Sequence, residues 1–97
     1  MLEFEFRERA QDDIYNIIEY GTAEHGEAAA RIYVEKIAAR IQWLVSNPRL
    51  GSVQSELRGG IRAFRQGQHR IYYVVDTAKL TVIRILHVSM DVRLQLE

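Results

Sequence analysis

The chain has 97 residues and no net formal charge at pH 7, and 47% of its residues are hydrophobic. A chain of this length has room for one domain, because a small domain needs almost all of its residues to bury a core. The absence of cysteine excludes a disulfide framework and a thiolate metal site. No apolar run approaches the length of a membrane-spanning helix, which is about 20 residues. The charged N-terminus has no apolar core of a signal peptide. We therefore expect one globular domain, residues 1–97, in the cytoplasm.

The net charge of zero hides an uneven distribution along the chain. Residues 1–27 carry a formal charge of about −6, whereas residues 58–97 carry about +4. Between positions 57 and 75 there is no acidic residue but four arginines, which are Arg58, Arg62, Arg65 and Arg70. Such a cluster is typical of a surface that binds carboxylates or phosphates. It equally fits arginines that pair with the acidic half of the same chain or are solvated, so both readings stay open.

The N-terminal quarter of the chain predicts a strand followed by a helix. Residues 2–6 alternate between apolar and acidic side chains, which is typical of a half-exposed strand. Apolar residues then recur with helical spacing at Ala10, Ile14, Ile17 and Ile18, and this stripe predicts a helix from about Glu8 to Glu24. Gly26 follows, and glycine readily takes the left-handed conformation that often ends a helix.

A second helix is predicted from a longer apolar stripe, which ends before Ser46-Asn47-Pro48 because proline disfavours helical geometry at the residue before it. Two helices joined by a short glycine-containing turn form an antiparallel hairpin. The stripe consists of Ala30, Tyr33, Val34, Ile37, Ile41, Leu44 and Val45.

Residues 61–86 predict three consecutive strands. Segments rich in β-branched and aromatic residues are broken at residues 66–68 and 76–79, as in antiparallel strands joined by short turns. Residues 71–75 and 82–86 are almost continuously apolar, so we expect these strands in the middle of a sheet with both faces covered. The predicted fold class is α+β, with an N-terminal strand, an antiparallel helical hairpin and a three-stranded antiparallel meander, the helices packing on one face of the sheet.

Two segments have no strong pattern. Residues 49–60 contain three glycines and scattered polar residues, and we predict a loop between the second helix and the meander. For the tail, residues 88–97, a short helical turn and a flexible end both remain open.

Two of the charged and aromatic residues in the predicted elements need an explanation. Arg84 lies in a predicted central strand, where an unpaired charge is unfavourable, so it needs a partner and Asp91 is one candidate. Trp43 lies off the apolar stripe of the second helix, and it either fills a crevice between the helices or marks a partner surface. Tyr72 and Tyr73 are predicted as core residues rather than base-stacking platforms.

The sequence has no glycine-rich phosphate loop, no paired metal-binding histidines and no serine elbow of the hydrolase type. No metal or cofactor is therefore predicted. We predict structural roles for His69 and His87. They become candidates for catalysis only if the fold places them beside arginines.

Short motifs spread over nearly the whole chain resemble one known family. They are A-x-x-D-I-x-x-I-x-x-Y at 10–20, N-P-x-L-G at 47–51, E-L-R-x-G-I-R-x-F at 56–64, G-x-H-R-I-x-Y at 67–73 and R-I-L-H-x-x-M-D at 84–91. In this order they resemble a ParE-type toxin of the RelE/ParE superfamily, and the last motif is fairly specific to the ParE branch. The resemblance implies the same fold that the residue patterns predict.

The resemblance also implies a function. The protein would be the toxin of a type II toxin-antitoxin system, inhibiting DNA gyrase, blocking replication and arresting growth, as in plasmid maintenance. A ParD-like antitoxin would neutralise it in a heterotetramer, using an amphipathic helix in a groove and an added strand. Such a toxin acts by binding a protein. The resemblance therefore implies no enzymatic activity, no cofactor and no membrane association, and no direct sequence-specific binding of nucleic acid by the toxin alone.

The implied binding residues fall into two groups. Those for the target are Arg84, His87, Met90 and Asp91. For the antitoxin, our own hypothesis is that Arg62, Arg65 and Arg70 receive its acidic segment and that Trp43 belongs to the same binding surface.

The RelE branch of the superfamily implies an alternative, a ribosome-dependent messenger RNA endoribonuclease. Cleavage needs a base, an acid and cations to stabilise the phosphorane. Here the base would be Glu56, the acid His87, and the cations Arg65, Arg70 and Arg84. The chain lacks the histidine or tyrosine that RNA-cleaving relatives carry past the last strand, and its low local charge does not favour tight RNA binding. A toxin-fold binding module without activity is the third hypothesis.

Overall fold

The structure is a computed structural model that describes residues 2–96. Its elements in chain order are β1 (Glu3–Phe6), α1 (Glu8–His25), α2 (Glu27–Ser46), β2 (Ser52–Val53), β3 (Arg62–Gln66), β4 (His69–Val75), β5 (Lys79–His87) and α3 (Val92–Gln95). The predicted α+β fold with its N-terminal strand, helical hairpin and meander is confirmed. Within residues 2–96, no helix has the length and apolar character needed to cross a membrane.

The five strands form one mixed sheet with the order β1-β5-β4-β3-β2. Strands β3, β4 and β5 pair antiparallel as predicted, and β4 and β5 are central. β1 lies parallel to β5, with Phe4 opposite Leu80. The prediction of a loop over residues 49–60 was wrong at Ser52–Val53, which pair with β3. A strand of two residues is too short to show the alternation by which strands are predicted.

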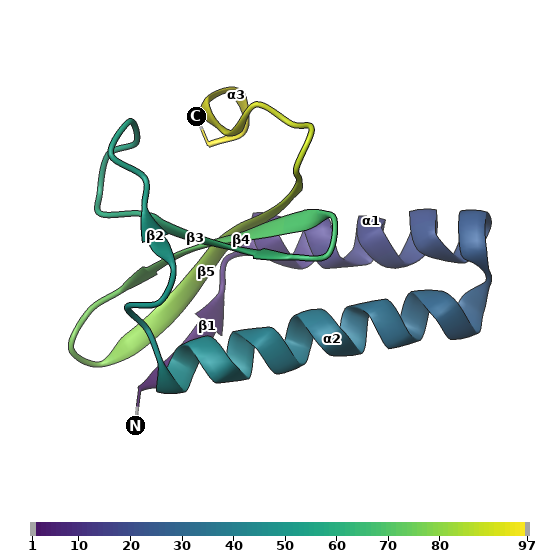
Figure 1. Ribbon diagram of the computed structural model, residues 1–97, viewed down its shortest axis with the longest axis horizontal. Coiled ribbons are helices and arrows are strands. Elements are labelled where there is room, and N and C mark those ends of the chain that lie inside the picture. The colour runs from purple at the N-terminus through teal and green to yellow at the C-terminus, as the bar shows by residue number, and fades with distance from the viewer. Residues whose placement is uncertain (1, 97) are drawn as a thin grey trace.

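The helical hairpin covers one face of the sheet (Figure 1). Helix α1 ends at His25, as predicted, and Gly26 follows with a φ of 90° and a ψ of 160°. This positive φ favours glycine, but the ψ differs from that of the predicted left-handed cap. The inner side of α2 is buried as the apolar stripe predicted, but Ile18 of α1 is 39% exposed. The core between helices and sheet consists of Ala10, Ile37, Ile41, Leu44, Val45, Ile71, Tyr73, Leu80, Val82 and Ile85.

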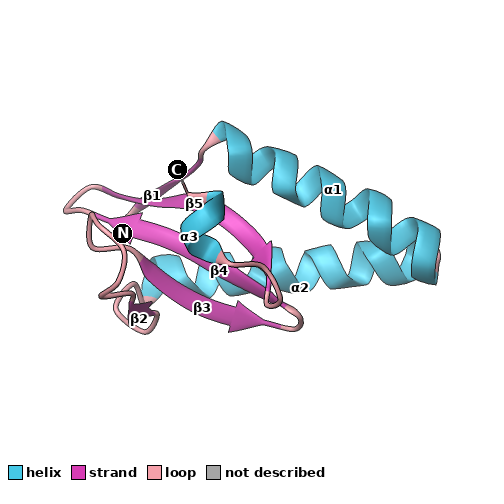
Figure 2. Ribbon diagram, turned by 90° about the horizontal axis from the view of Figure 1, so that it is seen from above, coloured by secondary structure: helices cyan, strands magenta, loops and turns pink. Residues whose placement is uncertain are grey.

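The opposite face of the sheet is covered by the tail and by the loop before β3. Figure 2 shows α3 in front of the strands and α2 behind them. Val92 and Leu96 of the tail pack on a second core, so a short helical turn is the correct alternative for this segment. This second core consists of Ala63, Tyr72, Ile83 and Leu86, and two buried faces explain the continuous apolar run in β5.

Candidate functional site

The helical hairpin extends beyond the sheet (Figure 1), and a groove of ≈ 950 Å³ lies between it and the end of the sheet that leads into the tail. Ile17 and Ala29 contribute apolar surface from the helices, and Leu86 and Met90 from the opposite side. Polar groups gather at the junction of the two walls, where strands β4 and β5 meet the helices. Grooves of this size with apolar walls and a few polar groups are typical of ligand and peptide sites.

Asp13 of α1 and Arg84 of β5 form a buried ion pair at this junction. Their side chains are 11% and 10% exposed. Arg84 Nε donates to Asp13 Oδ2 at 2.7 Å, and Nη2 donates to Oδ1 at 2.9 Å. The third nitrogen, Nη1, donates to the carbonyl oxygen of Gln95 at 2.7 Å. Because the hydrogen bonds to Asp13 stabilise the charged form, the pKa of Arg84 is raised.

The Asp13 carboxylate also completes the edge of the sheet. Strand β1 ends at Phe6, and the last backbone hydrogen bond to this side of β5 comes from Arg7 N to Val82 O. Further along β5, Ile85 N donates to Asp13 Oδ2 at 2.9 Å. One carboxylate therefore accepts three hydrogen bonds and fixes α1 to β5.

The partner predicted for Arg84 was therefore wrong, since Asp13 takes the place expected for Asp91. Asp91 precedes the short helix α3, where its carboxylate accepts the backbone N–H of Arg93 at 3.0 Å. It also pairs with the Arg93 side chain at 3.4 Å. A carboxylate at this position caps the helix rather than reaching back to the strand.

A chain of hydrogen-bonded and stacked groups runs along the floor of the groove. The hydroxyl of Tyr33 on α2 lies 2.6 Å from His69 Nδ1 on β4. The ring of His69 lies edge-to-face against that of His87 on β5, with centroids 5.4 Å apart. His87 Nδ1 in turn lies 2.8 Å from Ser89 Oγ.

Burial sets the electrostatics of these groups. It lowers the pKa of His69, and the neighbouring His87 lowers it further, whereas Asp13 acts in the opposite direction. Burial likewise raises the pKa of the Tyr33 hydroxyl. Both groups are therefore neutral near pH 7.

Known proteins share this architecture. The profile of the family described as the ParE toxin of the type II toxin-antitoxin system, parDE, matches residues 4–92. The chain belongs to the ParE toxin family. Toxin ParE1 of Caulobacter vibrioides is 30% identical over 96 residues, 99% of each chain, and Toxin ParE1 of Mycobacterium tuberculosis is 34% identical over 68 residues, 69% of each. A solved structure described as a chromosomal ParDE TA system from P. aeruginosa superposes with a TM-score of 0.79 at 20% identity, covering 92% of this chain and 98% of that one.

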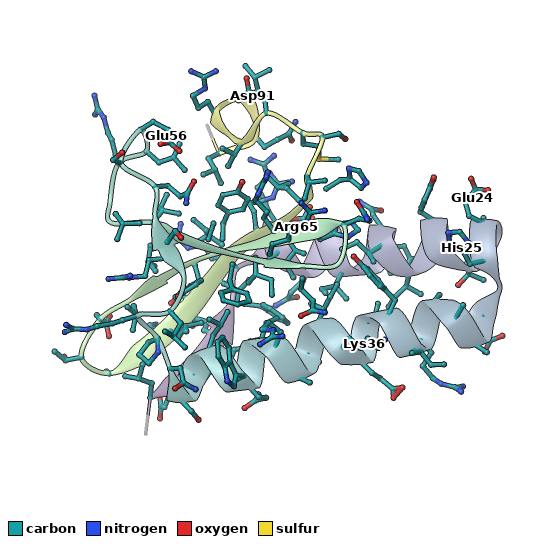
Figure 3. All side chains as sticks on the ribbon, viewed as in Figure 1. Glu24, His25, Lys36, Glu56, Arg65 and Asp91 are labelled. Carbon is teal, nitrogen blue, oxygen red and sulfur yellow. The ribbon has the colours of Figure 1, made fainter. Side chains whose placement is uncertain are left out.

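The four residues that the resemblance assigns to the target lie in two environments in this ParE toxin. Arg84 is only 8% exposed and is held by Asp13. His87 is half-buried on the groove floor. Met90 is 48% exposed, and Asp91 is exposed on the tail (Figure 3). Only this exposed pair offers free surface to a large partner.

The three arginines assigned to the antitoxin lie on β3 and β4 and donate to backbone carbonyls. Arg62 donates to the oxygens of Arg49 and Gly51, Arg65 to that of Gly67, and Arg70 to that of Val88. Arg65 and Arg70 are directly opposite each other across the two strands. Among residues 2–96, no carboxylate forms an ion pair with any of these three arginines.

Trp43, the fourth residue assigned to the antitoxin, packs between α2 and the sheet rather than between the helices. Its ring lies edge-to-face against Phe64 of β3 at 5.2 Å, and the Arg40 guanidinium lies 4.6 Å from the ring centroid. It remains 36% exposed. The crevice between the helices was thus the wrong alternative, and Trp43 is part of the surface beside β3.

The residues of the ribonuclease alternative do not form one cluster, although Arg65 and Arg70 are directly opposite each other. Glu56 lies on the loop before β3, whereas Arg65 lies near the far end of that strand (Figure 3). Arg84 is already bound to Asp13, so its charge is compensated within the fold. His69 and His87 meet each other and Tyr33 rather than a group of arginines. In the described part of the chain, no three His, Asp or Glu side chains are placed to hold a metal ion.

The sequence interpretation missed Asp13 as a functional-site residue. Its position carried a signal, because it lies three residues after Ala10 and four before Ile17, within the apolar stripe of α1. A carboxylate inside such a stripe indicates a buried partner. Tyr33 gave no comparable signal, since a tyrosine in an apolar stripe fits an ordinary core residue.

Proposed function

We propose that the free toxin inhibits DNA gyrase in the cytoplasm and that a ParD-like antitoxin neutralises it by placing an amphipathic helix in the groove. The observation that carries the proposal is the groove of ≈ 950 Å³, which is open between the helical hairpin and the sheet. A helix that buries an apolar face in such a groove is a common mode of peptide recognition. Two toxins and two antitoxins would form the assembly.

We further propose that inhibition requires binding and not catalysis. In support, the ion pair with Asp13 commits Arg84 to the fold, and Glu56 lies on the loop before β3, whereas Arg65 lies near the far end of that strand. A surface for a protein target needs no such constellation. Met90 and Asp91 are exposed at the start of the tail and fit the role of target-binding residues.

A bulky residue in the groove should prevent binding of the antitoxin. Ala29 is exposed and lines the groove, so we expect Ala29→Trp to weaken toxin-antitoxin binding by at least about tenfold, since filling the site removes apolar burial worth more than 1.4 kcal/mol. Binding is measured by calorimetry with the purified antitoxin.

The matched control is Ala28→Trp, an exposed position next to Ala29 on α2 that does not line the groove. It should bind the antitoxin as wild type does. Equal affinity of the two variants would contradict the groove as the antitoxin site.

The target is tested with two assays on one preparation. We expect the toxin to inhibit supercoiling by purified DNA gyrase and to leave messenger RNA intact in a ribosome-dependent cleavage assay. Cleavage of messenger RNA with gyrase unaffected would favour the ribonuclease instead. If neither activity appears and expression leaves growth unchanged, the protein is a binding module that uses the toxin fold.

A further inference from the structure

We propose that His69 and His87 together recognise a carboxylate on the peptide segment that occupies the groove. This inference rests on the proposed function, because it names the chemistry of the antitoxin segment. It predicts that the toxin takes up a proton when the segment binds, and that the acidic group of the partner lies over the floor of the groove.

The tautomer of His69 follows from the hydrogen bonds of Tyr33. The backbone N–H of Gln68 donates to the Tyr33 hydroxyl oxygen at 3.1 Å, so the single hydroxyl hydrogen is left to donate elsewhere. Its two possible acceptors are His69 Nδ1 at 2.6 Å and Gln66 O at 3.3 Å. The shorter contact makes Nδ1 the acceptor, and the proton of the neutral His69 ring is then on Nε2.

The tautomer of His87 follows from Ser89 in the same way. The backbone N–H of Ser89 lies 3.1 Å from His87 Nδ1, and an amide nitrogen can only donate. His87 Nδ1 therefore accepts, and the proton of this ring is also on Nε2. Both histidines thus direct an N–H donor away from the protein groups that hold them.

These two donors have no acceptor in the described part of the chain. No hydrogen bond joins either Nε2 atom to another residue, and no buried side-chain nitrogen lacks a partner, so both atoms are accessible. The two histidines line the groove with their rings edge-to-face. A group that enters the groove therefore meets one accessible N–H donor from each ring, and a carboxylate has an oxygen to offer to each.

The surrounding charges favour an anion at this point. Asp13, on α1, is the acid that acts on His69, and its charge is compensated by Arg84 of β5. From β3, Arg65 acts on Tyr33, whereas Arg70, the residue after His69 on β4, lies on the other face of the sheet and donates to Val88 O. The rest of the lining combines apolar side chains, such as Ile17 and Met90, with neutral polar ones, such as Asn16 and Gln68. Among the residues that line the groove, Arg84 is the one arginine or lysine and it is paired, which favours a peptide segment with one acidic residue over a nucleic-acid backbone that needs several cations.

The same hydrogen bonds allow His69 to accept a proton. If Nδ1 becomes protonated, it donates to the Tyr33 oxygen, and the hydroxyl hydrogen turns toward Gln66 O, which lies 3.3 Å away. No donor is then left without an acceptor. In the free toxin, burial lowers the pKa of His69 and keeps the ring neutral. A bound carboxylate raises it again, so protons are taken up on binding and affinity increases as the pH falls from 8 to 6.

The test is isothermal titration calorimetry of the full-length toxin with its purified antitoxin at pH 6, 7 and 8. Each titration is repeated in two buffers of different ionisation enthalpy, because the difference in measured heat counts the protons taken up even when binding is very tight. We expect proton uptake near pH 7 and an affinity that rises about tenfold between pH 8 and 6, corresponding to a shift of about one pKa unit.

The variants separate this inference from the groove proposal. His69→Gln with His87→Gln should abolish proton uptake while the complex still forms, and His87→Gln alone, which leaves the Tyr33–His69 contact intact, should reduce it. His25 also lines the groove, but at the outer end of the hairpin (Figure 3) and without contact to His69 or His87, so His25→Gln should leave uptake unchanged. A complex that forms without proton uptake, or whose uptake depends on His25, overturns the carboxylate proposal and leaves the groove as the antitoxin site. Absence of any complex at every pH overturns the proposed function, and this inference with it.

Discussion

Replacing Asp13 by alanine should lower the free energy of unfolding by about 3 kcal/mol, because it leaves the buried charge of Arg84 without its partner. Three hydrogen bonds are lost, two from the guanidinium and one from the backbone N–H of Ile85. Unfolding in urea followed by circular dichroism measures the loss.

The matched control for Asp13→Ala is Asp12→Ala, which removes the same charge from an exposed position on the same helix. We expect it to change the free energy of unfolding by no more than about 0.5 kcal/mol. If both variants lose equally little, the ion pair does not hold α1 to β5. Replacing both partners with apolar residues, Asp13→Leu with Arg84→Met, should be less destabilising than Asp13→Ala, since no charge then remains buried.

This ion pair changes how mutations of Arg84 are interpreted. Loss of toxicity in Arg84→Ala would follow from misfolding as readily as from a lost target contact, because the side chain connects α1, β5 and the tail. Met90 is 48% exposed and Asp91 is exposed, so substitutions there test the target surface with less effect on the fold. Stability and toxicity should be measured on the same variants.

Much of the fold could be predicted because the local patterns agree with each other. The apolar stripe of α2 has a helical period and β5 is a continuous β-branched run, and both elements form as these patterns predict. The parallel pairing of β1 with β5 was not predictable in this way, because it joins strands more than 70 residues apart. β2 and α3, of two and four residues, are too short for a period to be read.

The candidate site was less predictable than the fold because its groups come from distant parts of the chain. Asp13 and Arg84 are 71 residues apart, and Tyr33 and His69 are 36 apart. The position of Arg84 in a central strand predicted that it has an acidic partner. The sequence did not show which of the several acidic residues that partner is. His69 and His87 become directly opposite only through the register of β4 and β5.

The link between α2 and the sheet depends on a close contact at Gly51. This residue is buried, and a Cβ atom there would meet the hydroxyl oxygen of Tyr73 as its closest contact and would lie 2.7 Å from Cε1 and 2.8 Å from Cζ of the same ring. The Tyr73 side chain is fully buried, and its hydroxyl donates to Pro48 O at 2.7 Å and accepts from Gly51 N at 2.9 Å. The ring has no space to move away without breaking these bonds.

We therefore expect Gly51→Ala to lower the free energy of unfolding by about 2–3 kcal/mol, as measured by thermal or urea unfolding, because an added methyl group in a packed core forces its neighbours apart. Ser52→Ala, at the exposed next residue, is the control and should have little effect. Tyr73→Phe alone removes both hydroxyl hydrogen bonds and should lose about 1–2 kcal/mol. In the double variant the closest contact of the new methyl group is gone, so the combined loss should be smaller than the sum of the two. Additive losses would mean that Gly51 and Tyr73 act independently. The position of α2 beside the sheet, and with it the helical wall of the groove, would then not depend on the contact between these two residues.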